Sequence, residues 1–321
     1  LCEVIAKIMH QVEGAYSVVC SIVGKGLIAF RDPHGIRPLC IGQGQTQKDT
    51  FMFASETAPF FSLGLQSIGD VLPGELVYID QHAVMHRKVI HAEAFHPCVF
   101  EQVYFARPDA VLDDVSVYRA RLRMGQNLAY SWQQQYPDLS PDVVIPVPFS
   151  ANTAALSFAN ALGVRYSEGL YKNPFIGRTF IMPNGTMRKR SVRYKLSPQR
   201  TEIEDKKVLL VDDSIVRGTT SAEIVKVVRE CGAKEVYFAS TYPAVKYPCY
   251  YGIHIPTKEE LIANQMSEAD IAEHLGVDAL LYQEESSLIE AVDRRGEQDF
   301  SDPCRACING QYCAGTIEKQ E

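Results

Sequence analysis

The feature that most constrains the fold is an alternation of strand-like and helix-like segments from about residue 100 onward. Short apolar runs rich in β-branched residues recur, and a helical segment follows each of them. These runs lie at 142–148, 206–213, 235–240 and 278–283. Strands that alternate with helices in this way form a parallel sheet covered by helices. We therefore expect an α/β domain over 98–295.

Residues 1–97 follow a different pattern. After a helix-like opening segment, two β-rich runs flank a Gly-Lys-Gly turn at 24–26, and a second pair of runs covers 74–90. Such pairs predict β-hairpins. We expect a β-rich domain here, and a polar tail that contains cysteines over 296–321.

Capping residues mark the ends of several expected helices. The helix that follows the strand at 142–148 should begin at Ser150 and end at Gly163. A Ser or Thr three residues ahead of an acidic residue also predicts a helix start, and this spacing occurs at Thr257 and Ser267.

Composition excludes several classes of protein. The 321 residues carry a net charge of −7, which argues against a general nucleic-acid binder. There is no apolar run long enough for a membrane helix and no secretory signal, so we expect a cytoplasmic protein without a membrane partner. In that reducing compartment the nine cysteines are expected as thiols or metal ligands rather than disulfides.

The segment 208–220 reads VLLVDDSIVRGTT, which predicts a buried strand, a turn and the start of a helix near Ala222. Gly218 permits a tight turn and a close backbone approach. Three residues are expected to be able to cap the helix: Thr219, Thr220 and Ser221. Free N–H groups at a helix start bind anions, phosphate above all.

Two carboxylates, Asp212 and Asp213, end the strand of this segment. Carboxylates repel phosphate, but they suit sugar hydroxyls or a metal ion. A ribose that carries a 5′-phosphate combines both requirements, so we interpret 208–220 as a binding site for such a ligand.

The segment 208–220 resembles the phosphoribosyl-pyrophosphate (PRPP) motif of type I phosphoribosyltransferases. Six other segments extend the resemblance over nearly the whole chain: GAYSVV, AFRDPHGIRPL, VYFARPDA, DVVIPVP, GRTFIMP and YGIHIPTKEELIA. Together they are similar to glutamine PRPP amidotransferases (amidophosphoribosyltransferases), which open de novo purine biosynthesis. The resemblance implies a type I phosphoribosyltransferase domain over 98–295, preceded by the C-terminal remnant of an N-terminal-nucleophile (Ntn) glutaminase domain over 1–97.

The resemblance also implies roles for individual residues. The PRPP-binding set would be Ser150, Asp212, Asp213, Ser214, Arg217, Gly218, Thr219 and Thr220. Ser150, Asp212 and Asp213 would lie close to a Mg²⁺ that bridges to pyrophosphate. The basic segment 171–200 has eight Lys or Arg and no acidic residue. It would form a hood whose catalytic residues, Lys172 and Arg178, meet the pyrophosphate.

Two departures from the family pattern leave alternatives open. Phe149 stands where the family has an acidic residue, and Pro174 and Phe175 replace an Arg-Tyr pair in the hood. A phenyl ring accepts neither a hydrogen bond nor a metal as a carboxylate does. A catalytically impaired paralogue that senses PRPP or nucleotides is therefore an alternative to an enzyme. A third possibility is that the basic segment binds RNA.

Four cysteines match the family positions that hold a [4Fe–4S] cluster in some members: Cys98, Cys249, Cys304 and Cys307. Four thiolates suit such a cluster or a structural zinc ion. The other five are expected to be packing or surface residues: Cys2, Cys20, Cys40, Cys231 and Cys313.

The resemblance further implies a nitrogen source and partners. Family members take ammonia from glutamine with an N-terminal cysteine whose own amine acts as base. Cys2 does not stand in that context, so we expect this chain to use ammonia and to lack glutaminase activity. Homo-oligomers and feedback by purine nucleotides are implied as well.

Overall fold

The computed structural model describes residues 1–175, 195–255, 257–293 and 302–315. Two compact units share these residues. Unit 1 combines 1–120 with 249–254 and the segment from 292 onward, and unit 2 combines 121–248 with 255–291. The division of the chain into 1–97, 98–295 and 296–321 follows the family's domains and stays a prediction.

Unit 2 is built on a five-stranded sheet with the order β11-β10-β14-β15-β16. The strands are β10 (Val143–Pro146), β11 (Arg165–Tyr166), β14 (Lys207–Asp212), β15 (Glu235–Ser240) and β16 (Ala279–Tyr282). All four neighbouring pairs are parallel. The predicted parallel sheet is therefore confirmed, and β10 and β14 lie at its centre as direct neighbours.

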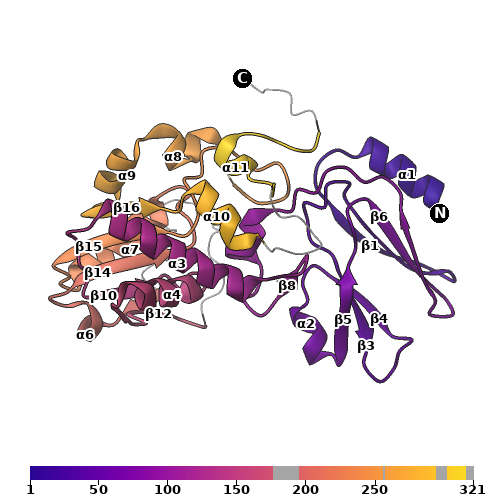
Figure 1. The fold of residues 1–321 in the computed structure, drawn as a ribbon, viewed down its shortest axis with the longest axis horizontal. Coiled ribbons are helices and arrows are strands. Elements are labelled where there is room, and N and C mark those ends of the chain that lie inside the picture. The colour runs from indigo at the N-terminus through magenta and orange to yellow at the C-terminus, as the bar shows by residue number, and fades with distance from the viewer. Residues whose placement is uncertain (176–194, 256, 294–301, 316–321) are drawn as a thin grey trace. The chain divides into compact units, whose positions relative to one another are not determined.

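Helices cover both faces of this sheet (Figure 1). They are α3 (Val117–Gln135), α4 (Asn152–Leu162), α7 (Thr219–Glu230), α9 (Glu268–Leu275) and α10 (Glu285–Val292). Trp132 of α3 and Phe158 of α4 pack in one cluster with Leu209. Ile224 of α7 packs in the other cluster with Leu210. Successive residues of β14 thus face opposite layers, which explains why the whole strand is apolar.

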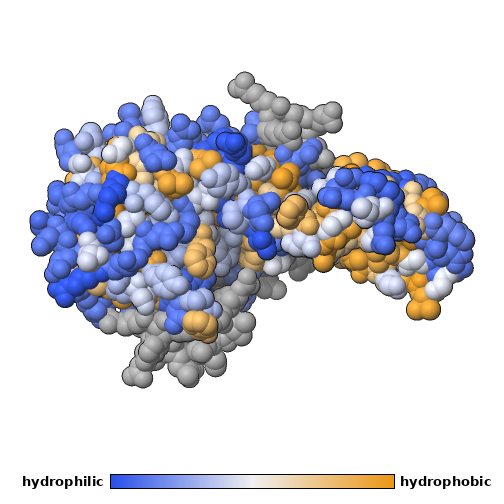
Figure 2. Space-filling model, turned by 90° about the horizontal axis from the view of Figure 1, so that it is seen from below, coloured by the Kyte–Doolittle hydropathy of each residue, from blue (hydrophilic) through white to orange (hydrophobic). Residues whose placement is uncertain are grey.

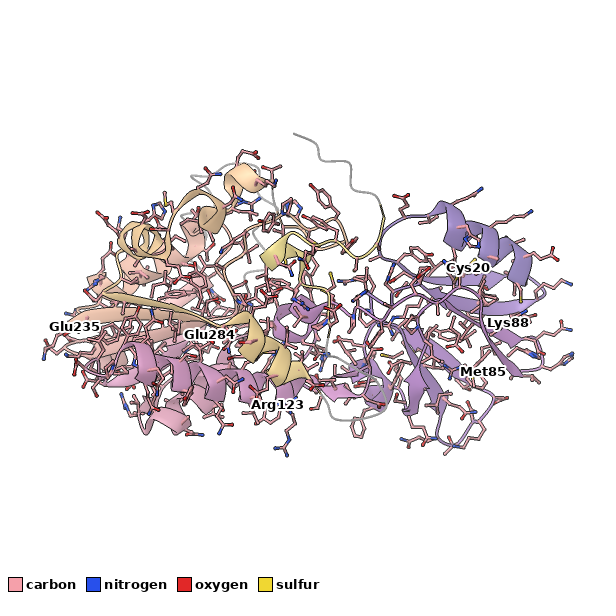
Figure 3. All side chains as sticks on the ribbon, turned by 45° about the horizontal axis from the view of Figure 1, so that its top comes forward. Cys20, Met85, Lys88, Arg123, Glu235 and Glu284 are labelled. Atoms are coloured by element: carbon pink, nitrogen blue, oxygen red, sulfur yellow. The ribbon has the colours of Figure 1, made fainter. Side chains whose placement is uncertain are left out.

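Helix α3 is fixed to its neighbours by polar contacts and by close packing. Nε of Arg123, labelled in Figure 3, donates to the carbonyl of Ala291 at 2.6 Å. A Cβ added at Gly125 would lie 2.0 Å from the carbonyl oxygen of Ala154 in α4. Glycine at this position therefore lets the backbones of α3 and α4 approach closely.

The observed helix ends confirm two of the predicted capping residues and contradict a third. Gly163 closes α4 in the left-handed conformation, and Ser267 forms the predicted capping box at the start of α9. Ser150 does not cap α4, which begins after Ala151, because its hydroxyl donates to Asp213 instead.

Two further predictions of where a helix begins were also wrong in detail. Helix α7 begins after Gly218, so the three residues expected as caps lie within its first turn and Gly218 is the N-cap. Thr257 makes no capping hydrogen bond and precedes a short 3₁₀ turn, η2 (Lys258–Glu260), which α8 (Ile262–Gln265) follows.

Unit 1 contains two antiparallel sheets. One has the order β1-β2-β6-β7, with bounds Ser17–Ile22, Gly26–Arg31, Glu75–Asp80 and Met85–Val89. The other has the order β4-β3-β5, with bounds Phe51–Ala54, Cys40–Gly44 and Leu65–Asp70. Both predicted hairpins are present as β1–β2 and β6–β7. Ala29 and Val77 of the first sheet share an apolar core with Ile41 of the second.

Helices and short strands complete unit 1. They are α1 (Cys2–Gln11), α2 (Ala58–Ser62), the π-helical turn η1 (Glu101–Phe105), β8 (Val111–Leu112), β9 (Val115–Ser116) and α11 (Ala306–Asn309). Ile5 and Met9 of α1 pack against Ile28 and Phe30 of β2. Because Ala29 faces the opposite core, β2 is apolar on both of its faces.

The face of unit 2 that is visible from below in Figure 2 is mostly polar. Figure 2 shows hydrophilic residues over most of the visible face of the part that unit 2 forms. Over the described ranges, no helix has the length and hydropathy needed to cross a membrane.

Candidate functional site

The candidate site lies where β10 and β14 end, at the carboxyl edge of the sheet in unit 2. Ligands of open parallel sheets bind at this edge, because the loops that leave the strands open there. Asp212 is the last residue of β14 and Asp213 follows it. Val147, just after β10, donates its N–H to the carbonyl of Val211 at 2.8 Å, so the two chain segments stay side by side beyond β10.

Hydrogen bonds connect four of the predicted PRPP-binding residues. The hydroxyl of Ser150 donates to one carboxylate oxygen of Asp213. The hydroxyl of Ser214 donates to the other oxygen at 2.6 Å. The N–H of Asp213 donates to the carboxylate of Asp212 at 2.8 Å. The structure therefore brings Ser150, Asp212, Asp213 and Ser214 together, as a shared ligand requires.

The two carboxyl groups are buried next to each other, with exposed fractions of 8% for Asp212 and 7% for Asp213. Burial, and then the negative charge of Asp213, raise the pKa of Asp212 well above its ordinary value. Burial also raises the pKa of Asp213, and hydrogen bonds from Ser150 and Ser214 oppose that rise. Two adjacent buried carboxylates are an unfavourable arrangement that a cation or a set of hydroxyl donors would relieve.

Arg121 is a further charged residue at this site, and the sequence analysis missed it. Its side chain is only 3% exposed, and its positive charge lowers the pKa of Asp213. It follows Val117 by four residues and precedes Met124 by three on α3, both fully buried. An arginine within the apolar stripe of an amphipathic helix was the signal available in the sequence.

The turn between β14 and α7 holds the expected phosphate-binding residues. Gly218 is the N-cap of α7 with φ +74°, and the N–H of Ala222 bonds to its carbonyl at 2.8 Å. Thr219 and Thr220 form the first turn of the helix. The N–H groups of this first turn lack partners within the helix, which is what makes a helix start suitable for a phosphate.

The segment η2–α8 packs against this turn. Nε of Arg217 lies 2.5 Å from a carboxylate oxygen of Glu260, and the N–H of Ile262 donates to the carbonyl of Val216 at 3.1 Å. A Cβ added at Gly218 would lie 2.5 Å from Cδ1 of Ile262. Glycine at 218 therefore suits the left-handed backbone, and an added methyl group would require either the tip of Ile262 or the turn itself to shift.

We expect Gly218→Ala to weaken PRPP binding about tenfold, because the new methyl group meets Ile262 and strains the turn that presents the N–H groups. Gly163→Ala is the matched control, since Gly163 has φ +68° and no heavy atom within 4 Å of an added Cβ. Both changes should cost about 1–2 kcal/mol of folding free energy for the left-handed alanine. Calorimetric titration with PRPP checks the prediction, and equal affinities in the two variants would refute it.

The basic segment is described only at its two ends. They pair as antiparallel strands β12 (Leu170–Lys172) and β13 (Leu196–Pro198), with α6 (Arg200–Ile203) following. Lys172 lies with its Nζ 4.9 Å from the ring centroid of Phe149, the residue before Ser150. The structure thus places Lys172 next to the loop that carries Ser150. Arg178 lies outside the described residues.

Three of the four predicted cluster cysteines lie close together in unit 1. Cys98 and Cys304 form an isolated parallel bridge, in which the N–H of Val99 donates to the carbonyl of Cys304 at 3.2 Å. Burial raises the pKa of Cys98, and the charges of Cys304 and Cys249 raise it further. Burial likewise raises the pKa of Cys249. These three thiols therefore interact electrostatically with one another.

Cys307 and Cys313 follow Cys304 in the same C-terminal segment of unit 1. Cys307 lies in α11, buried, three residues after Cys304. The thiol of Cys304 hydrogen-bonds to Cys313 and thereby lowers the pKa of Cys313, so Cys313 is more than the ordinary packing residue the sequence predicted. Within 1–175, 195–255, 257–293 and 302–315, no three His, Cys, Asp or Glu side chains are arranged as a metal site.

Known proteins similar to the chain are amidophosphoribosyltransferases, although no family model matches. The chain is 47% identical over 308 residues to the enzyme of Pseudomonas aeruginosa, a match that covers 95% of the chain and 61% of that protein. It is 43% identical over 318 residues to the Escherichia coli enzyme, covering 98% and 63%. The chain therefore spans about 60% of the length of these curated relatives.

Solved structures give the same result. Glutamine PRPP amidotransferase from B. subtilis, complexed with ADP and GMP, superposes with a TM-score of 0.86 at 36% identity, covering 98% of the chain and 67% of that protein. A structure described as the allosteric regulatory enzyme of purine biosynthesis has a TM-score of 0.84 at 35% identity, covering 99% and 70%. The fold is thus a type I phosphoribosyltransferase domain with part of an Ntn domain, and the chain belongs to the amidophosphoribosyltransferase family.

Proposed function

We propose that the chain transfers the phosphoribosyl group of PRPP to ammonia, which forms 5-phosphoribosylamine and releases pyrophosphate. The observation that carries the proposal is the contact between Ser150 and Asp213 beside the N-terminus of α7. One site then offers acceptors for ribose hydroxyls and donors for phosphate. A ribose phosphate with a charged leaving group needs both.

Different residues bind different parts of the ligand. Asp212 and Asp213 accept hydrogen bonds from the ribose hydroxyls, and the first turn of α7 binds the 5′-phosphate. The nitrogen lone pair of ammonia forms the new bond to the anomeric carbon. The bond from that carbon to oxygen breaks, pyrophosphate leaves with the electron pair, and the new ammonium group releases one proton to water. Positive charge from Lys172 favours that departure.

Magnesium fits the donor set of this site. Ser150, Asp212 and Asp213 offer the oxygen ligands that Mg²⁺ prefers, and a cation would relieve the repulsion between the two buried carboxylates. When bound, Mg²⁺ neutralises charge on the pyrophosphate. In this proposal the protein residues orient the ribose and exclude water, while the metal is held by these three side chains.

A second candidate function is a PRPP or nucleotide sensor without turnover, and Phe149 is the observation that favours it. Its ring replaces a potential metal ligand directly before Ser150, so the transfer step loses one oxygen donor. Binding and catalysis then separate: a sensor would bind PRPP but release no pyrophosphate.

The test is an assay of pyrophosphate release from Mg²⁺-PRPP by the 321-residue chain, run with ammonium and with glutamine in parallel. Ammonium is the proposed nitrogen source, because ammonia is itself the nucleophile at the phosphoribosyl site and needs no glutaminase step. Pyrophosphate release that depends on ammonium supports the enzyme. Binding without release would favour the sensor, and turnover with glutamine would contradict the proposed nitrogen source.

We further propose that Cys98, Cys249, Cys304 and Cys307 hold a [4Fe–4S] cluster. Four thiolates are the usual ligands of such a cluster, and the bridge between Cys98 and Cys304 brings two of them together. Cys249 comes from a different stretch of unit 1 than Cys98 or Cys304. A cluster bound to all of them would join these stretches covalently through its metal.

Replacement of one ligand should remove the cluster. We expect Cys98→Ser and Cys249→Ser to lower the iron and sulfide content to background and to lower the Tm, because a bound cluster stabilises the fold that presents its ligands. Cys20→Ser is the control, since Cys20 is exposed on β1 (Figure 3). The measurement is iron, sulfide and zinc analysis after anaerobic purification. Zinc in place of iron would reassign the metal, and no metal in the wild-type protein would rule out the site.

Partners and location complete the proposal. The B. subtilis relative was solved with ADP and GMP, so purine nucleotides are proposed as feedback inhibitors of this chain, together with a homo-oligomeric state. All nine cysteines are free of disulfides, as is typical of a reducing compartment such as the cytoplasm.

A further inference from the structure

We propose that Phe149 is a positioning residue that holds the ammonium group of Lys172 for the pyrophosphate part of the ligand through a cation–π contact. The inference rests on the proposed function and deepens it, because it assigns a role to one of the residues at which the sequence resemblance implies a departure from the family pattern. The observation that carries it is the distance of 4.9 Å between Nζ of Lys172 and the ring centroid of Phe149.

Phe149 connects two parts of the site. The next residue, Ser150, donates its hydroxyl to Asp213, while the ring of Phe149 lies against Lys172 of β12. The short segment 149–150 thus contacts both the carboxylates and the nearest described lysine of the basic segment. A side chain at 149 is therefore well placed to set where Lys172 lies.

The exposure of Phe149 also needs an explanation. Its side chain is 61% exposed, although a phenyl ring gains free energy when it leaves water. The described part of unit 2 exposes few other large apolar side chains, namely Tyr130, Tyr171, Phe175 and Met266. A cation within about 6 Å of the ring face is attracted to its electrons, which gives an exposed ring a function that core packing does not.

The backbone around Lys172 limits where its ammonium group can lie. Lys172 pairs with Leu196 across the two strands, and the N–H of Asn173 donates to the carbonyl of Lys195 at 2.7 Å. Partial burial lowers the pKa of Lys195, and the charge of Lys172 lowers it further. Two lysine side chains therefore repel each other at the base of the basic segment.

A phenyl ring and a carboxylate at position 149 would affect the charge of Lys172 differently. A carboxylate at 149 would form an ion pair with Lys172 and cancel its charge. The ring attracts the ammonium group but carries no net charge, so the full positive charge stays available to an anion. A ligand with several negative charges close together, such as pyrophosphate, gains most from this arrangement.

The experiment measures the affinity of the full chain for two probes by calorimetry: Mg²⁺-pyrophosphate and ribose 5-phosphate. We expect Phe149→Leu to weaken pyrophosphate binding about threefold and to leave ribose 5-phosphate binding unchanged. Phe149→Trp should restore or exceed wild-type affinity, because indole binds cations best among the aromatic rings. Tyr130→Leu is the matched control, since Tyr130 is an exposed aromatic residue on α3 of the same unit, and it should change neither affinity.

A double-mutant cycle with Lys172→Met separates the proposed contact from a general effect of the ring. In the Lys172→Met background, Phe149→Leu should have no further effect on pyrophosphate binding. An equal loss in both backgrounds, or no loss in the wild-type background, would overturn the role of Phe149 while the proposed function stands. If the wild-type chain bound neither probe nor PRPP, the proposed function itself would fail, and this inference with it.

Discussion

Replacement of either buried carboxylate, by Asp212→Asn or Asp213→Asn, should lower the rate of pyrophosphate release from PRPP by more than about 100-fold. Each change removes a charged acceptor for ribose hydroxyls and a ligand for the metal, and a charged hydrogen bond contributes about 1.5–3 kcal/mol. Two such losses at one residue correspond to a factor of about 100 or more. The measurement is kcat/KM with ammonium as the nitrogen source.

The same Asp212→Asn variant should be more stable than the wild type at pH 7 without metal or ligand. The raised pKa of Asp212 means that the folded chain favours the protonated form. Ionisation of Asp212 therefore costs stability as the pH rises above the unfolded value of about 4. The gain in Tm should shrink towards pH 4. Asp138→Asn, at an exposed aspartate of unit 2, should change neither rate nor Tm. A destabilised Asp212→Asn variant with normal turnover would contradict both expectations.

The largest effect on stability is expected in unit 1 from Asp113→Asn. The guanidinium of Arg31 bonds to both carboxylate oxygens of Asp113, at 2.6 and 2.9 Å, and the two side chains are 1% and 4% exposed. Asparagine suits the left-handed backbone of Asp113, so the backbone does not account for the loss. The change removes the carboxylate that is bonded to the buried guanidinium, which keeps its hydrogen bonds to the carbonyls of Gly35, Arg37 and Val71. Breaking a buried ion pair in this way costs about 3–5 kcal/mol of unfolding free energy.

An exposed pair of the same type supplies the control. Arg107 binds both carboxylate oxygens of Asp109, at 3.0 and 2.8 Å, but these side chains are 62% and 55% exposed. Asp109→Asn should therefore cost less than about 1 kcal/mol. Denaturant unfolding of the two variants measures the difference. Equal losses would show that burial does not determine the strength of the Arg31–Asp113 pair.

Much of the fold was predictable because local patterns and tertiary packing agree. The β-branched runs of unit 2 became neighbouring parallel strands, since each run is apolar on both faces and both faces are covered. Gly163 closes α4 as expected, because a left-handed C-terminal residue favours glycine whatever surrounds it.

The errors occurred where a side chain has a tertiary partner. Ser150 was expected to cap α4, but its hydroxyl bonds to Asp213, which lies 63 residues away in the sequence. Arg121 was missed because its role depends on Asp213, which only the packing of α3 brings near. The contact between Lys172 and Phe149 likewise joins strand β12 to the loop that precedes α4. Such pairings are set by the fold, so no local pattern predicts them.

The most direct test of the central claim is calorimetric titration of the 321-residue chain with PRPP, in the presence and absence of Mg²⁺. The account predicts saturable binding at one site per chain that Mg²⁺ strengthens and that Asp213→Asn weakens at least tenfold. Absence of PRPP binding by the folded wild-type chain in the presence of Mg²⁺ would contradict it, as would binding that Asp213→Asn leaves unchanged.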